Sequence, residues 1–289
     1  MHGTGVPLVT PIADDGRVDH ERLEALVDWF ASAGIDFFVP CGSTGEAPLL
    51  TADERTQVVE TVADATEKPV LAGTGHEGYE PTLEATEGAA AAGADAALVV
   101  TPSYYGSDDA ALGRYYHNLA DKSPIPIYLY SVPKFTDYPL SPRLVESLAT
   151  HENVAGIKDS SGSIESIQRL VRFTADADFS VLVGHGSVYA HALDAGADGG
   201  VLAVANAVPD LASEVFEIHQ SGDAAAARDL NAAIVELNRT VTARYGVPGI
   251  KAALAHRGLE VGPPRRPLEP VGEDAAAEIT AVLEAALEA

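Results

Sequence analysis

The sequence predicts a closed (β/α)8 barrel that is followed by a helical extension. Eight short apolar runs recur along the chain, and amphipathic helical patterns lie between most of them. Continuous apolar runs, as opposed to alternating ones, are typical of parallel strands that are covered on both faces. Eight strand-then-helix units within residues 1–206 therefore favour a barrel.

The eight runs predict the strands, and the clearest helical patterns cover residues 19–34 and 52–66. An open, doubly wound sheet is the alternative, but such a sheet often carries a G-x-G-x-x-G turn after its first strand. Here "IADDGRVD" follows the first run. The predicted strands cover residues 5–11, 36–40, 69–75, 95–102, 126–133, 154–159, 180–186 and 199–204.

The remaining residues, 207–289, predict helices and not a second domain. No linker long enough to separate an independent domain follows the eighth run. The Pro-rich stretch "GPPRRPLEP" separates the last two of these helices. We therefore expect a barrel over residues 1–206 and a helical extension over 207–289 that packs on it. The helices are expected near residues 208–220, 223–244, 248–256 and 272–288.

The charge balance excludes some classes of partner. The chain has 18 basic and 43 acidic residues among 289, a net charge of −25. Such a surface repels nucleic acids and anionic membranes. The acids are spread over helical patterns, which indicates a solvated acidic shell. We expect a protein adapted to a salt-rich cytoplasm, where screening weakens self-repulsion; an acidic protein of an ordinary cytoplasm is the alternative.

The sequence also lacks the features of membrane proteins, secreted proteins and proteins that bind a metal or a redox cofactor. No apolar stretch approaches the length of a membrane-spanning helix, and the N-terminus shows no secretory signal pattern. Cys41 is the only cysteine, so an internal disulfide and a multi-cysteine metal site are excluded. No flavin, nicotinamide or metal signature is present. We therefore expect a cytoplasmic protein without cofactor or metal.

Polar residues collect where the predicted strands end. Active sites of (β/α)8 barrels lie at the C-terminal ends of the strands, so these residues should converge in space. They are Ser43 and Thr44 after the second strand, Tyr104 and Tyr105 after the fourth, Tyr130 in the fifth, Lys158 at the end of the sixth and His185 after the seventh.

Lys158 and Tyr130 are the strongest candidates. A lysine that leaves a buried strand is costly unless its charge is paired or its amine is partly neutral. Lys158 is therefore either a solvated strand end or a working amine. Tyr130 is either a core tyrosine or a proton carrier, and its place one strand before Lys158 favours the second role.

Each of the other candidate residues could have a structural role instead of a functional one. The "GSTGE" stretch is either a plain tight turn or a cradle of backbone N–H groups for a carboxylate. His185 fits a structural and a functional role equally well. Cys41 is expected to be packed and not nucleophilic, and Glu46 is expected to cap or pair.

Together these parts predict chemistry on a 2-oxo acid. Desolvation in an apolar barrel should lower the pKa of the Lys158 amine, and a neutral amine attacks a ketone to form a Schiff base. The protonated imine stabilises an adjacent carbanion, Tyr130 moves protons, and the "GST" turn holds the carboxylate. The sequence therefore predicts a lyase or aldolase.

The motifs "GSTGE", "TPSYYG", "YSVP" and "GIKDSSG" on eight βα units resemble the dihydrodipicolinate synthase/N-acetylneuraminate lyase family of class I aldolases. The resemblance covers residues 3–260 approximately, including "GVPGIKAAL". It implies a TIM barrel with a C-terminal helical extension, pyruvate as substrate and a homotetramer. It also implies a Schiff base on Lys158, proton transfer by Tyr130 and a role for Tyr104 in a neighbouring subunit's site. The implied substrate-binding residues are Ser43, Thr44 and Leu202.

One departure from the family pattern bears on the substrate. Members that make dihydrodipicolinate resemble "Y-N-V-P-x-R-T-G", in which the Arg binds a carboxylate of the aldehyde partner. Here Phe135 stands in place of that Arg and Asp137 in place of the Gly, while the adjacent Lys134 is expected to point elsewhere. A phenyl ring cannot form the two parallel hydrogen bonds that an arginine makes to a carboxylate.

Three functions are therefore left open. The preferred one is cleavage of 2-keto-3-deoxygluconate, or its 6-phosphate, to pyruvate and glyceraldehyde or its 3-phosphate, in carbohydrate metabolism. The alternative is 4-hydroxy-tetrahydrodipicolinate synthase, which condenses pyruvate with aspartate semialdehyde. A non-catalytic ligand-binding relative is disfavoured, because Lys158, Tyr130 and the "GST" turn are all present.

Overall fold

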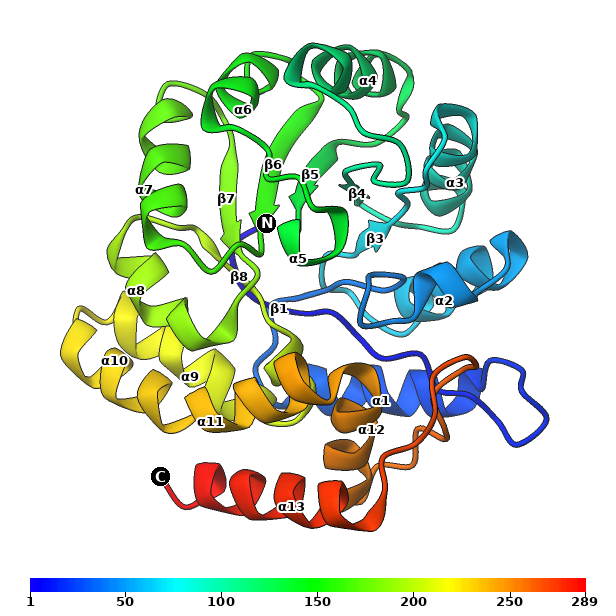
Figure 1. The fold of residues 1–289 in the computed structure, drawn as a ribbon, viewed down its shortest axis with the longest axis vertical. Helices are drawn as coiled ribbons and strands as arrows, with labels where there is room; N and C mark the ends of the chain where they lie inside the picture. Colours follow the sequence, from blue (N-terminus) through cyan, green and yellow to red (C-terminus); the bar gives the residue numbers. More distant parts are fainter.

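The computed structural model describes residues 1–289 and confirms the (β/α)8 barrel (Figure 1). The strands are all parallel and run in the order β2-β1-β8-β7-β6-β5-β4-β3. A parallel bridge between Phe38 and Val70 joins the two ends of this order and closes the barrel. The strands are β1 Gly3–Val6, β2 Phe37–Phe38, β3 Leu71–Gly73, β4 Ala96–Val100, β5 Ile127–Ser131, β6 Val154–Asp159, β7 Ser180–Val183 and β8 Gly199–Val201.

The helices surround the strands, and α9 follows β8 and packs against β1 (Figure 1). Three 3-10 turns, Ala47–Leu49, Gly186–Val188 and Ala203–Asn206, follow strand ends, and a π-helix covers Arg239–Arg244. The helices are α1 His20–Ser32, α2 Ala52–Asp64, α3 Tyr79–Ala91, α4 Asp109–Lys122, α5 Pro133–Thr136, α6 Pro142–Leu148, α7 Ile164–Phe173, α8 Tyr189–Asp194, α9 Pro209–Gln220, α10 Ala224–Ala233, α11 Val235–Asn238, α12 Gly246–His256 and α13 Glu273–Leu287.

Local sequence signals set many of these boundaries. The side chain of Thr51 accepts a hydrogen bond from the Glu54 backbone N–H, and Glu54 returns one to the Thr51 N–H, which is a capping box at the start of α2. Gly34 and Gly93 end the turns after α1 and α3 with φ of 88° and 92°, a region that suits glycine. The observed strands are shorter than most of the predicted runs, because the prolines and polar residues at the ends of those runs lie outside the hydrogen-bonded strands.

The core has two parts. A large cluster of 62 buried residues lies between strands and helices, and ten further residues fill the barrel itself. Leu98, Tyr128, Leu182 and Val201 belong to the inner group, as does Tyr130. The interior is therefore packed, and a site must lie at its C-terminal mouth.

The C-terminal segment is bound to that mouth by buried charges. The Lys251 amine on α12 lies 2.7 Å from the Glu46 carboxylate, and both side chains are almost fully buried. Glu46 also accepts a hydrogen bond from the Arg265 backbone N–H at 2.6 Å. The pairing expected of Glu46 is confirmed, and Lys251 and Arg265 are held beside the "GSTGE" turn. The boundary of the extension at residue 207 stays a prediction.

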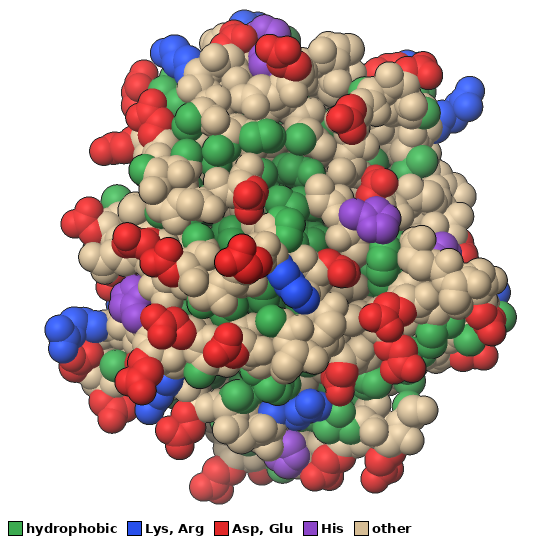
Figure 2. Space-filling view, turned by 180° about the vertical axis from the view of Figure 1, so that it is seen from behind, with side chains coloured by type: hydrophobic (Ala, Val, Ile, Leu, Met, Phe, Trp, Pro, Cys, Tyr) green, Lys and Arg blue, Asp and Glu red, His purple; other side chains and the backbone are tan.

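The surface carries the charge that the composition implies. Asp and Glu side chains are scattered over the face shown in Figure 2, with few Lys and Arg among them. None of the helices combines the length and apolar character that a membrane crossing requires.

Candidate functional site

Lys158 and Tyr130 lie side by side at the end of the barrel. They are paired positions in the parallel register of β5 and β6. The Lys158 Nζ lies 4.4 Å from the centroid of the Tyr130 ring, and the two residues are 5% and 6% exposed. Lys251 is the only lysine in an ion pair, so the Lys158 amine has no carboxylate partner.

Neighbouring residues leave room for this amine and fix the loop after it. A Cβ at Gly184, just after β7, would lie 1.9 Å from Ser160 Oγ and 3.0 Å from Lys158 Cε, so glycine at this position leaves space for both side chains. Asp159 accepts hydrogen bonds from the Ser161 N–H at 2.7 Å and from Ser166 Oγ at 2.5 Å. In the "KDSSG" stretch, the Lys158 amine therefore has no acidic partner, and hydrogen bonds to Asp159 order the loop that follows it.

A cavity of about 190 Å³ brings the predicted residues together. Ser43, Thr44, Tyr130, Lys158 and His185 all line it. Residues of the C-terminal segment also line the cavity: Thr242, Ala243, Gly246, Val247 and Ile250. The site thus lies between the barrel mouth and the extension.

The turn that carries Ser43 and Thr44 is held in an unusual conformation. Cys41 and Glu46, which flank it, have φ of 54° and 59°, in the left-handed region that costs non-glycine residues energy. A Cβ at Gly45 would lie 2.9 Å from the Leu8 carbonyl oxygen, so that position needs glycine. The buried Glu46–Lys251 pair ties the end of this turn to α12.

Two predicted site residues lie outside this cavity. Tyr104 is 78% exposed and does not line it. Its loop is held by Glu77, which accepts hydrogen bonds from the Ser103 and Tyr104 backbone N–H groups at 2.8 Å. Leu202 is fully buried, and its neighbours Val201 and Ala203 line the cavity. Substrate contacts of Tyr104 and Leu202 stay predictions.

Lys134 corrects an expectation from the sequence. It lines the cavity together with Phe135, because α5 turns the chain back over the mouth. Nothing in the sequence indicated this, since the direction of a side chain in a single-turn helix depends on its tertiary contacts. The expectation that Lys134 points elsewhere is therefore wrong.

His185 belongs to the same cavity. Burial lowers its pKa, and the positive charge of Lys134 lowers it further. Its Nδ1 is buried without a hydrogen-bond partner. The imidazole is therefore neutral at neutral pH and offers the cavity a polar group that carries no charge.

Cys41 is packed, as expected. Its thiol is buried and donates a weak hydrogen bond to the Arg55 carbonyl oxygen at 3.5 Å. Burial raises the pKa of the thiol to about 12. Because the nucleophile is the thiolate, Cys41 has no such role at neutral pH.

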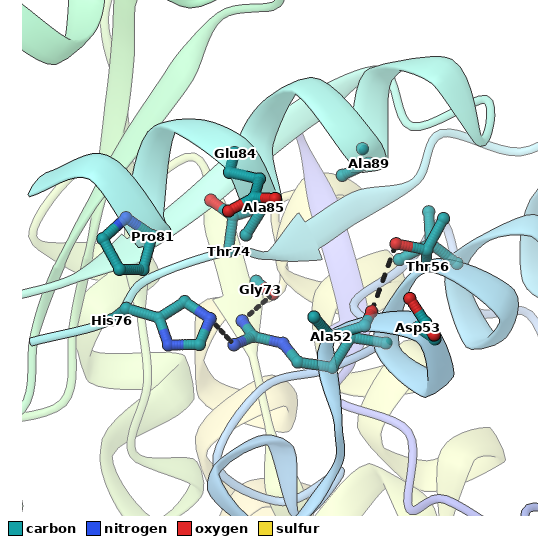
Figure 3. A pocket seen from close by; sticks show the side chains of 13 residues that line it. Ala52, Asp53, Thr56, Gly73, Thr74, His76, Pro81, Glu84, Ala85 and Ala89 are labelled. Atoms are coloured by element: carbon teal, nitrogen blue, oxygen red, sulfur yellow. Dashed lines mark hydrogen bonds between the residues drawn. The ribbon is translucent and has the colours of Figure 1, made fainter. Parts of the chain in front are cut away.

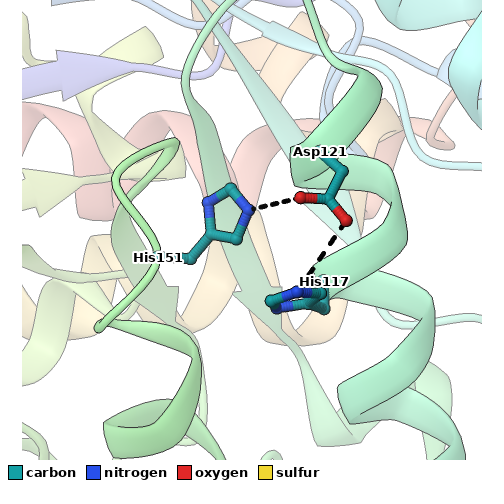
Figure 4. Close-up of side chains that lie close together, drawn as sticks. All are labelled: His117, Asp121 and His151. Carbon is teal, nitrogen blue, oxygen red and sulfur yellow. Dashed lines mark hydrogen bonds and ion pairs between the residues drawn. The ribbon is translucent and has the colours of Figure 1, made fainter.

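His117, Asp121 and His151 form a separate cluster of potential metal ligands, shown in Figure 4. The Asn153 N–H donates to His151 Nδ1 at 3.0 Å, so His151 carries its proton on Nε2 and donates it to Asp121 Oδ1 at 3.1 Å. A metal at Nε2 would force that proton to Nδ1, against the Asn153 N–H. The cluster instead joins α4 to the turn after α6.

Comparisons with known proteins agree with this geometry. The family model described as the dihydrodipicolinate synthetase family matches residues 1–286. The chain is 37% identical over 283 residues to a 4-hydroxy-tetrahydrodipicolinate synthase of Methanothrix thermoacetophila, covering 98% of this chain and 96% of the relative. It is 35% identical to an uncharacterized DapA-like lyase of Halobacterium salinarum over 98% of this chain and 93% of the relative.

Solved structures give the same result. A dihydrodipicolinate synthase from Thermotoga maritima superposes with a TM-score of 0.95 at 30% identity, covering 99% of this chain and 98% of the other. YagE from E. coli K12, a prophage protein of the same family in complex with pyruvate, gives 0.93 at 30% identity and covers 99% of both chains. The chain belongs to the dihydrodipicolinate synthetase family and is a pyruvate-dependent lyase of the lysine Schiff-base class.

Proposed function

We propose that the Lys158 amine attacks the ketone carbon of pyruvate and forms an imine with loss of water. Loss of a proton from the pyruvate methyl group then gives an enamine, which adds to the carbonyl carbon of an aldehyde. Tyr130 carries the protons, and Ser43 and Thr44 hold the pyruvate carboxylate. The unpaired Lys158 amine beside the Tyr130 ring is the observation that supports this most directly.

We propose aspartate semialdehyde as the aldehyde partner, which makes the reaction that of 4-hydroxy-tetrahydrodipicolinate synthase. The carboxylate of this partner needs a cation, and Lys134 supplies one at the cavity. The name of the Methanothrix relative supports the same reaction. The sequence-based preference for a 2-keto-3-deoxygluconate aldolase has no support from the named relatives.

The sugar-acid aldolase is kept as a second candidate because of Phe135. This side chain lines the cavity and is 62% exposed, where the family pattern for dihydrodipicolinate formation has an arginine. An apolar ring there makes no charged contact with a carboxylate. An aldehyde that carries hydroxyl groups is compatible with such a position.

Two assays on the same preparation decide between the candidates. We expect a higher kcat/KM for condensation of pyruvate with aspartate semialdehyde than for cleavage of 2-keto-3-deoxygluconate or its 6-phosphate. Lys134→Met should lower the semialdehyde kcat/KM by roughly 10- to 100-fold, since a charge-assisted hydrogen bond contributes about 1.5–3 kcal/mol. Lys134→Arg should retain most of it.

The contrary results are equally clear. Faster cleavage of either sugar acid would replace the synthase with the aldolase. Borohydride trapping of the pyruvate imine should be unaffected by Lys134→Met, which separates the choice of aldehyde from the chemistry at Lys158. Phe135→Arg should move the ratio of the two kcat/KM values toward the semialdehyde.

We also propose a cytoplasmic homotetramer in which Tyr104 completes the site of a neighbouring subunit. The exposure of Tyr104 and Tyr105, at 78% and 77%, supports this, because two adjacent exposed aromatic rings are typical of a contact surface.

A further inference from the structure

Lys251 and Glu46 form a buried ion pair that joins α12 to the "GSTGE" turn. Their side chains are 4% and 0% exposed. The Lys251 amine also donates to the Thr10 and Pro263 carbonyl oxygens, at 2.9 Å each. Its pKa is lowered from 10.5, first by burial, although the Glu46 carboxylate raises it, so the pairing does not fully offset the loss of water. Stability is therefore a poor explanation for this pair.

The two ends of the "GSTGE" turn are held by different parts of the molecule. Just before its start, the Cys41 thiol donates to the Arg55 carbonyl oxygen. The Gly73 N–H donates to the Pro40 carbonyl oxygen at 2.9 Å. The Arg55 guanidinium contacts the His76 imidazole and donates to the Gly73 carbonyl oxygen at 2.8 Å (Figure 3). Helix α2 and strand β3 therefore hold the start of the turn.

The end of the turn is held by the C-terminal segment. Glu46 has a left-handed φ of 59°, which suits glycine, but a glycine could not make the contacts of the Glu46 carboxylate. This carboxylate lies 2.7 Å from the Lys251 amine and accepts from the Arg265 N–H at 2.6 Å. Thr10, whose carbonyl oxygen accepts from Lys251, donates through its hydroxyl to the Gly45 carbonyl oxygen at 2.7 Å. Lys251 therefore reaches the end of the turn by two routes.

The helix that carries Lys251 also lines the catalytic cavity. Ile250, which precedes Lys251 in the chain, lines it from α12, while Ser43 and Thr44 line it from the turn. A shift of α12 relative to the barrel would therefore be passed to the turn through the ion pair. Misplacement of a binding group by about 1 Å is enough to cost about 100-fold in rate.

We propose that Glu46 and Lys251 are positioning residues, which set the orientation of Ser43 and Thr44 from α12 and thereby the affinity for the pyruvate carboxylate. This role rests on the proposed function, in which Ser43 and Thr44 hold that carboxylate. Glu46 and Lys251 themselves do not line the catalytic cavity, so they act through the turn and not on the substrate.

Borohydride trapping over a range of pyruvate concentrations tests this role without any aldehyde. Glu46→Gln and Lys251→Met should each raise the pyruvate concentration for half-maximal trapping, and the KM for pyruvate, by about 10- to 100-fold. At saturating pyruvate Lys158 should still be labelled, and kcat should fall less than kcat/KM. Glu54→Gln is the matched control, because it breaks the Arg265–Glu54 pair on the same segment but outside the cavity. Its KM for pyruvate should stay within about twofold of the wild type.

A double variant separates positioning from stability. Either single substitution leaves one buried charge without its partner and should lower the melting temperature. Glu46→Gln combined with Lys251→Met leaves neither charge, so the double variant should regain much of that loss. Its KM for pyruvate should nevertheless stay raised, because the ionic contact between the turn and α12 is still missing. This variant also provides the measurement if a single variant does not fold.

Recovery of the wild-type KM for pyruvate in the double variant would overturn the proposal, because the pair would then act on stability alone. An equal rise of KM in Glu46→Gln and Glu54→Gln would do the same, as would an unchanged KM in both single variants and the double variant. If the wild type itself shows no pyruvate label on Lys158, the proposed function fails, and the positioning role fails with it. Normal trapping by the wild type with unchanged variants refutes the positioning role only.

Discussion

The amine of Lys158 lies 4.4 Å from the centre of the Tyr130 ring, because the two residues are register partners on neighbouring parallel strands. The ring covers one side of the amine and places a phenol within the same cavity. The register of the two strands therefore holds the amine and the phenol ring next to each other.

We expect Lys158 to be the residue that forms the imine. Borohydride treatment in the presence of pyruvate should add one reduced pyruvate to a peptide that contains Lys158, measured by mass spectrometry. Lys158→Ala should abolish both the label and turnover. Lys251→Met is the matched control, since Lys251 is also buried but is paired with Glu46. Labelling of any other lysine would refute the assignment.

We expect Tyr130→Phe to separate proton transfer from imine formation. The substitution keeps the ring beside Lys158 and removes the hydroxyl. Trapping of pyruvate should persist, while turnover should fall by roughly 10²–10⁴, the usual contribution of a positioned acid–base group. Steady-state kinetics and trapping on the same preparation measure both. Turnover within about twofold of the wild type would exclude this role.

Tyr104 and Tyr105 provide a matched pair, because both are about equally exposed in the single chain. If Tyr104 completes a neighbouring site, Tyr104→Phe should lower kcat by roughly tenfold or more, whereas Tyr105→Phe should affect mainly the association of subunits. Sedimentation velocity run beside the kinetics separates the two effects. Equal loss of kcat in both variants, with intact tetramers, would contradict a specific role for Tyr104.

The net charge of −25 predicts a dependence on salt. Repulsion among surface carboxylates is screened as the ionic strength rises, so the melting temperature and the activity should increase toward molar KCl. KCl is preferable to sulfate, which also strengthens the burial of apolar surface. A melting temperature that is flat or falls over this range would favour an ordinary acidic protein.

The Arg265–Glu54 pair predicts how stability depends on acid. Hydrogen bonds from Arg265 lower the pKa of Glu54 to about 2 from its ordinary value of 4.5. A lowered carboxyl pKa stabilises the folded state fully above 4.5, and this contribution disappears as the pH falls through 2. The difference in melting temperature between the wild type and Glu54→Gln should therefore shrink from neutral pH toward pH 2.

Glu146→Gln is the control for this measurement. It removes an exposed pair with Arg143, for which little stabilisation is expected at any pH. A difference between the wild type and Glu54→Gln that stays constant with pH would show that the Glu54 carboxylate is not the source of the effect.

The sequence alone predicted the barrel and the convergence of four polar residues at one cavity, while the catalytic and binding roles of these residues stay predictions. Its eight apolar runs and helical patterns follow from local periodicity, and parallel strands must place their C-terminal ends at one mouth. Ser43, Thr44, Tyr130 and Lys158 could be predicted there because each stands at a strand end, where position along the chain fixes position in space.

Only the tertiary structure decided the positions of Lys134, Leu202 and Arg55. Lys134, on α5, lines the cavity, while Leu202 is buried in the core between two residues that line the cavity. The contact between Arg55 and His76 joins residues 21 positions apart on different elements. The physical reason is that such side-chain directions depend on packing between elements, which local periodicity does not encode.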